Sequence, residues 1–373
     1  IIITSIYKIF NRDKIYLIGE RKEQCQDNGY HLFKYIREKH PSERVFYIID
    51  KKSPAYMKIK KYGNIIQHNS LKHYIYYFLA DKHISAFQFF GVPETPFLWK
   101  LEEGGVIKKK KIFLQHGITK EMLPFLKYEN TKYRLFVCGA KSEYEYVKET
   151  FGYPNDNVKY LGFCRFDNLH EFAEKKQILV MPTWRQWLGM TNEDNNAKED
   201  EEKFKRSDYY TVYSNLINNA NLQHILKENE YELIFYPHPE MQRFIHLFKN
   251  TNANIKIADR KTYNLQELLK ESKIIITDYS SIAFDCAYMK KSLIYYQFDK
   301  EEYYKNHFEK GYFDCERDGF GPVIKTEEDL IEYIKVLIKN NCFNEIYYRR
   351  ANNFFALYDT DNCKRNYEAI KLI

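Results

Sequence analysis

The chain has 373 residues, 44% of them hydrophobic and 29% charged, a balance that predicts a globular protein and excludes an intrinsically disordered one. This length is enough for two domains, each with its own core. The formal net charge of +7 favours an anionic partner, such as a nucleotide, a phosphate polymer or an anionic membrane surface. No zinc-finger spacing, RNA-binding signature or basic heptad pattern indicates nucleic acid.

The cysteines and the first residues bear on the compartment. Seven cysteines are scattered along the chain without a CxxC pair, which favours a reducing compartment over a disulfide framework or a structural zinc site. The first residues lack the layout of a signal peptide and do not begin with Met, so the sequence is expected to be part of a longer chain. Because no run approaches the ~18 apolar residues of a spanning helix, we expect a protein that does not cross a membrane.

Strand and helix patterns alternate through the first half of the chain. Apolar runs typical of strands occur at residues 15–19, 44–50, 64–67, 84–90, 112–114 and 135–137. Segments with helical spacing alternate with them, at residues 29–39, 54–61, 71–80 and 142–151. This alternation predicts a parallel sheet with right-handed crossovers.

The alternation restarts near residue 177. Strands are predicted at residues 177–181, 233–236, 255–258, 273–276, 293–296 and 323–324. Helices are predicted at residues 209–227, 265–272 and 327–339, with a tail that is helical throughout from residue 344. The polar, acidic segment 191–206 is interpreted as a mobile loop.

These patterns predict an α/β fold with two Rossmann-like domains, residues 1–170 and 171–350. Two such domains facing each other across a cleft resemble the B-type (GT-B) arrangement of nucleotide-sugar glycosyltransferases. That resemblance implies that the C-terminal helices, residues 351–373, cross back and pack on the N-terminal domain.

Four predicted strands end in polar or charged residues: FLQHG (113–117), LVMPTWR (179–185), IFYPHP (234–239) and IIITDYSS (274–281). In open parallel sheets, ligands bind outside the carboxyl ends of the strands. We therefore expect the four ends to converge on one site. The last of them places hydroxyl groups at the start of a helix, which fits either an anion site or an ordinary helix cap.

The same segments, in the same order, resemble the CDP-glycerol glycerophosphotransferase family, which includes teichoic acid and capsule polymerases that use CDP-glycerol or CDP-ribitol. The resemblance covers residues 15–370, and the segments 284–285, 295–299 and 321–323 also fit. Two places depart from the family pattern. Ile118-Thr119 stands where the family usually has Thr-Pro, and residues 361–365 match only loosely.

The resemblance implies transfer of a polyol phosphate, most simply glycerol phosphate, from a CDP-activated donor to a hydroxyl of a teichoic-acid-like or capsular acceptor, with release of CMP. It implies a donor-binding second domain and an acceptor-side first domain. His116 suits the general base and His238 a second catalytic role. For each the alternative is an incidental histidine in a turn.

The other expected site residues divide between donor and acceptor. Donor and phosphate contacts are expected from Thr183, Arg185, Thr277, Asp278, Ser280 and Ser281. A surface salt bridge is the alternative for Arg185, and a helix cap is the alternative for Asp278. Gln115 and Gly117 are expected on the acceptor side.

We expect no resident cofactor and no metal, since no paired acidic motif stands in a suitable context, although many phosphoryl transfers use Mg²⁺. The cysteine pattern and the cytosolic synthesis of the donor imply a cytoplasmic protein. The family's lipid-linked acceptors imply peripheral contact with an anionic membrane through residues 69–82 and 108–111, for which a core-facing helix and a solvated loop are the alternatives. Two other functions stay open, namely a nucleotide-sugar glycosyltransferase and a non-catalytic module of a polymer-assembly complex.

Overall fold

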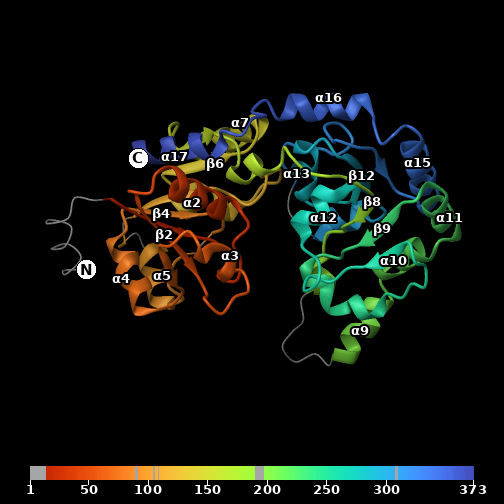
Figure 1. The fold of residues 1–373 in the computed structure, drawn as a ribbon, viewed down its shortest axis with the longest axis horizontal. Coiled ribbons are helices and arrows are strands. Elements are labelled where there is room, and N and C mark those ends of the chain that lie inside the picture. Colours follow the sequence, from red (N-terminus) through yellow and green to blue (C-terminus); the bar gives the residue numbers. More distant parts are fainter. Residues whose placement is uncertain (1–13, 89–90, 104–105, 108, 190–196, 307–309) are drawn as a thin grey trace. The chain divides into compact units, whose positions relative to one another are not determined.

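The computed structural model describes residues 14–88, 91–103, 106–107, 109–189, 197–306 and 310–373. The chain divides into two compact units. Unit 1 comprises Ile1–Ile118, Leu123–His170 and Phe355–Ile373, and unit 2 comprises Thr119–Met122 and Glu171–Phe354. Each unit contains one parallel sheet with helices packed against it (Figure 1).

The sheet of unit 1 has the order β3-β2-β1-β4-β5-β6-β7, and all its described pairs are parallel. Its strands are β1 (Ile15–Gly19), β2 (Arg44–Ile49), β3 (Ile65–Gln67), β4 (Lys82–Ser85), β5 (Lys110–Phe113), β6 (Leu135–Cys138) and β7 (Val158–Tyr160). The helices are α2 (Asn28–Lys39), α3 (Tyr56–Lys60), α4 (Leu71–Leu79), α5 (Pro96–Glu103), α6 (Tyr128–Thr131), α7 (Lys141–Thr150) and α17 (Asn362–Leu372), with 3-10 turns η1 (Pro124–Leu126) and η2 (Cys164–Asn168).

The sheet of unit 2 has the order β10-β9-β8-β11-β12-β13 and is likewise parallel. Its strands are β8 (Lys175–Val180), β9 (Glu232–Phe235), β10 (Ile255–Ile257), β11 (Ser272–Thr277), β12 (Ser292–Tyr296) and β13 (Val323–Ile324). The helices are α8 (Gln186–Gly189), α9 (Ala197–Lys205), α10 (Asp208–Asn218), α11 (Ala220–Asn229), α12 (Leu265–Glu271), α13 (Ile282–Tyr288), α14 (Lys300–Asn306), α15 (Glu327–Lys339) and α16 (Glu345–Phe354), with 3-10 helix η3 (Pro239–Leu247).

Side-chain caps and buried apolar faces explain where the helices start. Asp27 accepts a hydrogen bond from the first backbone N–H of α2, whereas Ser70, Ser207 and Thr326 accept from the third backbone N–H of α4, α10 and α15. Strands β1, β6 and β12 are almost wholly buried, as expected when helices cover both faces of a parallel sheet.

Three predicted elements differ from the structure. Within the segment interpreted as a mobile loop, the described residues 197–205 form helix α9, whose acidic first turn and basic last turn complement the helix dipole, and Phe204 anchors it in the core. The single helix predicted at 209–227 is two helices, because Asn219 leaves the helical conformation and caps α11. The C-terminal tail is not helical throughout, since residues 355–361 separate α16 from α17.

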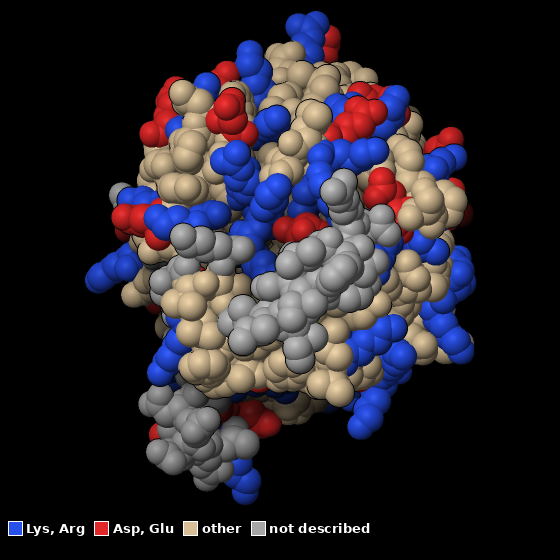
Figure 2. Space-filling view, turned by 90° about the vertical axis from the view of Figure 1, so that its left-hand side faces the viewer, with Lys and Arg blue, Asp and Glu red and all other residues tan. Residues whose placement is uncertain are grey.

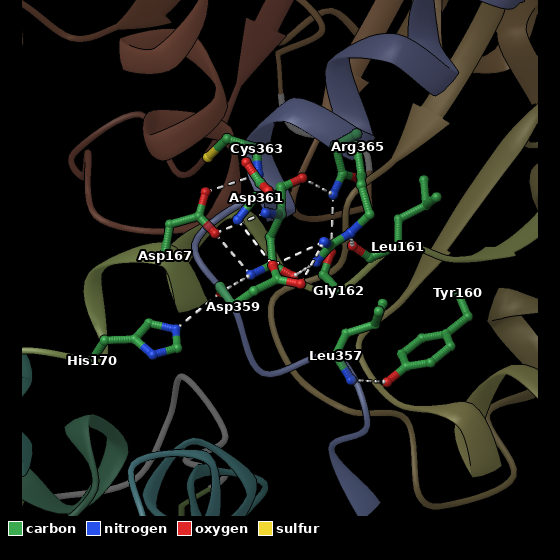
Figure 3. A network of polar contacts seen from close by, with 12 residues as sticks. Tyr160, Leu161, Gly162, Asp167, His170, Leu357, Asp359, Asp361, Cys363 and Arg365 are labelled. Atoms are coloured by element: carbon green, nitrogen blue, oxygen red, sulfur yellow. Dashed lines mark hydrogen bonds and ion pairs between the residues drawn. The ribbon is translucent and has the colours of Figure 1, made fainter.

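Helix α17 packs on unit 1, against α2 and η2 (Figure 1). Asp167 accepts hydrogen bonds from the backbone N–H groups of Asn362 and Cys363 at 2.9 and 2.8 Å (Figure 3). Arg365 donates to the Leu161 carbonyl at 3.0 Å and pairs with Asp359 at 2.8 Å. These contacts are made by backbone and side-chain groups in the first turns of α17, so they fix where the helix begins.

Gly162 allows α17 to approach the chain after β7 closely. Its φ is +76°, and a Cβ at this position would lie 1.8 Å from the side-chain oxygen of Asn362. Its carbonyl accepts a hydrogen bond from the Asn366 amide at 2.9 Å. A side chain at position 162 would therefore displace the helix.

Candidate active site

His116 lies three residues beyond the end of β5 in unit 1, and it is exposed. Its ring stacks on Phe87 with a centroid distance of 4.6 Å and an interplanar angle of 12°. Protein atoms around the ring, and then the positive charges of Arg165 and Arg21, lower the pKa of His116 to about 4. The imidazole is therefore neutral at physiological pH and can accept a proton.

Gln115 holds the turn that presents His116. Its φ of +58° lies in the left-handed region. Its buried side-chain amide donates to the Val137 carbonyl at 2.6 Å and to the Glu143 carboxylate at 3.0 Å. The side chain of Asn28 donates in turn to the Gln115 carbonyl at 2.7 Å. Gly117, next to His116, is half-buried.

The sequence did not single out a group of charged residues beside this turn. Buried Arg165 pairs with Asp27 at 3.2 Å, and its backbone N–H donates to the Asn28 side chain at 3.0 Å. Glu20, at the end of β1, accepts from the backbone N–H groups of residues 26, 27 and 30. Burial and the nearby Asp27 raise the pKa of Glu20 to about 7. The only signal in the sequence was their position after a strand or before a helix.

In unit 2, Arg185 is fully buried between two carboxylates. It donates to Asp278 at 2.9 Å and to Asp299 at 2.6 and 3.0 Å. It also donates to the Thr183 carbonyl at 2.7 Å. Despite burial, these carboxylates raise the pKa of Arg185 well above its ordinary value. Its donors are directed at protein groups, which favours a positioning role over direct contact with phosphate.

Aromatic rings enclose the same guanidinium. Its carbon lies between 5.2 and 5.9 Å from the ring centroids of Tyr209, Tyr279, Phe298 and Tyr303. Tyr279 stacks on Tyr303 at 3.7 Å and donates its hydroxyl to Asp299 at 3.0 Å. The chain is rich in tyrosine, and three of its tyrosines surround Arg185.

Asp278 connects the end of β11 to the end of β8. Its carboxylate accepts from the backbone N–H and hydroxyl of Thr183 at 2.9 and 2.5 Å, and from the backbone N–H of Tyr279 at 2.6 Å. The hydroxyl of Thr277 donates to the Met181 carbonyl at 2.8 Å. Both Thr277 and Asp278 are buried, so they brace the turn rather than face solvent.

Ser280 and Ser281, which follow this braced turn, are half-buried. Ser281 is the residue that precedes α13, and the Ser280 hydroxyl accepts from the backbone N–H of Ile282 at 3.3 Å. Both residues are therefore partly accessible to solvent, unlike Thr277 and Asp278.

His238 follows β9 and is half-buried. Its ring is stacked near Trp184, with a centroid distance of 6.2 Å and an angle of 20°. Its Nδ1 accepts from the backbone N–H of Glu240 at 3.3 Å, so the neutral ring carries its proton on Nε2. Unit 2 thus brings together Thr183, Arg185, Thr277 and Asp278 in one buried cluster, with Trp184 linking it to His238.

A family model described as CDP-Glycerol:Poly(glycerophosphate) glycerophosphotransferase matches residues 2–372. The chain belongs to this family. The fold and the family expected from the sequence are therefore confirmed. None of the described helices is both long and apolar enough to cross a membrane.

Curated relatives act in teichoic acid synthesis according to their names. The chain is 37% identical over 369 residues to the minor teichoic acid biosynthesis protein GgaB of Bacillus subtilis (strain 168), covering 98% of this chain and 40% of that protein. It is 31% identical over 186 residues to a teichoic acid poly(glycerol phosphate) polymerase of Bacillus spizizenii, covering 50% of this chain and 40% of that protein. The chain thus spans about two fifths of the length of these relatives.

Solved structures share the fold. The wall teichoic acid polymerase TagF matches with a TM-score of 0.68 at 17% identity, over 96% of this chain and 88% of that one. The UDP-GlcNAc 2-epimerase of Neisseria meningitidis matches with a TM-score of 0.55 at 11% identity, over 96% of this chain and all 100% of that one. Both support the GT-B-type α/β architecture.

Proposed function

We propose that this chain transfers glycerol phosphate from CDP-glycerol to a hydroxyl of a teichoic-acid-like or capsular acceptor. The observation that supports this most directly is the exposed imidazole of His116 beyond the end of β5, on a turn held by the buried amide of Gln115. An alcohol nucleophile needs a base that is unprotonated at working pH, and a pKa of about 4 keeps this ring available. Family membership and the relatives named above supply the choice of donor.

In the proposed reaction, His116 accepts the proton of the acceptor hydroxyl as its oxygen attacks the β-phosphorus of the donor. The bond from this phosphorus to the bridging oxygen breaks, and CMP leaves with the additional negative charge. The hydroxyls of Ser280 and Ser281 and the Nε2–H of His238 donate to the phosphates. Arg185 and Asp278 hold the donor turn in place without touching the nucleotide.

The test is release of CMP from a panel of donors, with and without a polyol-phosphate acceptor. We expect CMP from CDP-glycerol, with CDP-ribitol as the comparison and UDP-sugars as negative controls. Release of the nucleotide from a UDP-sugar instead would establish a glycosyltransferase. No release from any donor, by protein that still binds CDP-glycerol in calorimetry, would establish a non-catalytic module.

We also propose peripheral contact with an anionic membrane through unit 1. Helices α4 and α5 pack together through the Tyr74–Thr95 hydrogen bond of 2.6 Å. They leave Leu71 and Phe97 78% and 66% exposed. Lys and Arg side chains gather on the face drawn in Figure 2. Exposed apolar side chains beside lysines are typical of membrane-surface helices.

The lysines expected in this surface differ in their exposure, because Lys110 is exposed whereas Lys82 is buried and donates to the Ile370 carbonyl. Burial and the nearby charges of Lys14 and Lys110 lower the pKa of Lys82 to about 8. Lys108, expected in the same surface, lies outside the described residues. Flotation with vesicles tests the proposal. Binding to phosphatidylglycerol vesicles and not to phosphatidylcholine vesicles is expected, and equal recovery with both would refute the electrostatic part.

A further inference from the structure

Three side chains stack in series at the carboxyl edge of unit 1. The guanidinium of Arg21 lies over the ring of Phe87, 5.0 Å from its centroid. The ring of Phe87 stacks in turn on His116 at 4.6 Å. The three residues follow β1, β4 and β5, which are adjacent in the sheet. The distance from the guanidinium carbon of Arg21 to the centroid of the His116 ring is therefore no greater than the sum of these two distances.

The backbone on which this stack stands is fixed. The Ser85 hydroxyl donates to the Phe87 carbonyl at 2.6 Å and accepts from the Phe87 backbone N–H at 3.1 Å. Glu20, directly before Arg21, is buried and accepts from the backbone N–H of Tyr30 at 2.7 Å. Arg21 and Phe87 thus extend from anchored positions, which reduces the conformational entropy lost on binding a ligand.

The two arginines near His116 differ in what they can bind. Arg165 is buried, pairs with Asp27, and lies over the rings of Phe163 and Phe166 at 4.9 and 5.3 Å. Arg21 is exposed, and its guanidinium carbon lies over the ring of Phe87. A guanidinium stacked by its face still presents in-plane N–H groups, which match the geometry of a phosphate.

We infer that Arg21 binds a phosphate group of the acceptor chain while the terminal hydroxyl of that chain lies at His116. The inference rests on the proposed function, because it assumes that His116 receives the acceptor hydroxyl. What it adds to the proposed function is the residue that contacts the acceptor phosphate. Phe87 separates the two contacts and sets the distance between the bound phosphate and the base.

Binding of a synthetic tri(glycerol phosphate) tests this inference directly, with its neutral methyl phosphotriester analogue as the comparison ligand. Wild-type protein should bind the charged trimer about 10- to 100-fold more tightly, the range of one charge-assisted phosphate contact. Arg21→Gln should abolish that ratio, and Arg21→Lys should retain part of it. Because Arg21 is exposed, thermal unfolding should not change.

Lys22→Gln is the matched control, since it removes the same charge one residue away. Lys22 pairs with Glu94 at 2.8 Å at the surface. It should keep the ratio between the two ligands to within about twofold. An unchanged ratio in Arg21→Gln, or an equal loss in Lys22→Gln, would overturn the inference.

Kinetics separate a binding role from a role in orienting His116. Arg21→Gln should raise KM for the charged acceptor and leave KM for CDP-glycerol unchanged. A lower kcat with both acceptors, at unchanged KM, would show that the stack only orients the imidazole. If wild-type protein releases no CMP from any donor, the proposed function fails, whereas the binding ratio still decides whether Arg21 recognises phosphate.

Discussion

The turns after β5 in unit 1 and after β11 in unit 2 use charge in opposite ways. In unit 1, His116 is exposed, and the amides of Gln115 and Asn28 hold its turn. In unit 2, the charged residues Arg185 and Asp278 are buried against each other, and hydroxyl groups remain nearer to solvent. The polar end of a strand thus presents an exposed imidazole in unit 1 and a buried ion pair in unit 2.

Among substitutions that test this difference between the two turns, His116→Ala is expected to have the largest effect. His116→Ala should lower the rate of CMP release by roughly 10²–10⁴-fold, because no base remains at the hydroxyl. Its unfolding free energy should change little, since the side chain is exposed. Turnover in a continuous CMP assay and urea unfolding measure the two quantities. Near-normal turnover would remove His116 from the reaction.

Substitution of Arg185, unlike substitution of His116, should lower the unfolding free energy strongly. Arg185→Leu leaves two buried carboxylates without their cation and should cost about 3–5 kcal/mol of unfolding free energy. Arg317→Leu is the control, because it removes an exposed ion pair with Asp318 and should change the unfolding free energy far less. Equal losses in urea unfolding would contradict the buried brace.

Arg365→Ala should destabilise unit 1 by about 2 kcal/mol, because it removes contacts to Leu161 and Asp359 that hold α17. Arg349→Ala removes an exposed pair with Glu345 and should change the free energy by less than about 0.5 kcal/mol. Thermal unfolding distinguishes the two. If both variants unfold alike, the contacts shown in Figure 3 do not stabilise the unit.

The serine hydroxyls should have a smaller effect, confined to the donor. Ser280→Ala and Ser281→Ala should each weaken binding of CDP-glycerol by about tenfold, the worth of one hydrogen bond to a charged group. Calorimetry with CDP-glycerol measures this effect. Unchanged affinity in the double variant would place the phosphates elsewhere.

The smallest expected change is in the pH profile. The pKa of His116 is lowered, so the neutral form persists down to about 4, and kcat/KM should stay constant from pH 7 to about pH 5.5. A histidine at its ordinary value of about 6.5 would lose half its base form near neutrality. Loss of half the activity near pH 6.5 would show that His116 titrates normally.

The sequence predicted most of the α/β alternation, because buried parallel strands and amphipathic helices have distinct periods. Helix α15 has the same bounds as predicted, Glu327–Lys339. Helix α9 was missed, since its sequence is acidic and only Phe204 reaches the core. The break at Asn219 was missed because a cap residue also fits the interior of a longer polar pattern.

The candidate site was predictable at the level of strand ends but not of individual roles. Residues that end parallel strands meet at one edge, so His116 and Arg185 could be selected from their positions. A sequence does not show whether a guanidinium already has carboxylate partners. That information lies in Asp278 and Asp299, which are far from Arg185 in the chain. Arg21 and Phe87 were not selected either, because they are far from His116 in the chain and the sequence does not show which distant side chains come into contact.

Helix α17 has a consequence for the order in which the chain can fold. Unit 1 contains both the first residues described and the last, so the ribosome makes all of unit 2 before it makes the final helix of unit 1. Until then, the carboxylate of Asp167 and the carbonyl of Gly162 lack the partners they have in the finished protein. Unit 2 can reach its native structure during synthesis, whereas unit 1 must wait until α17 has been synthesised.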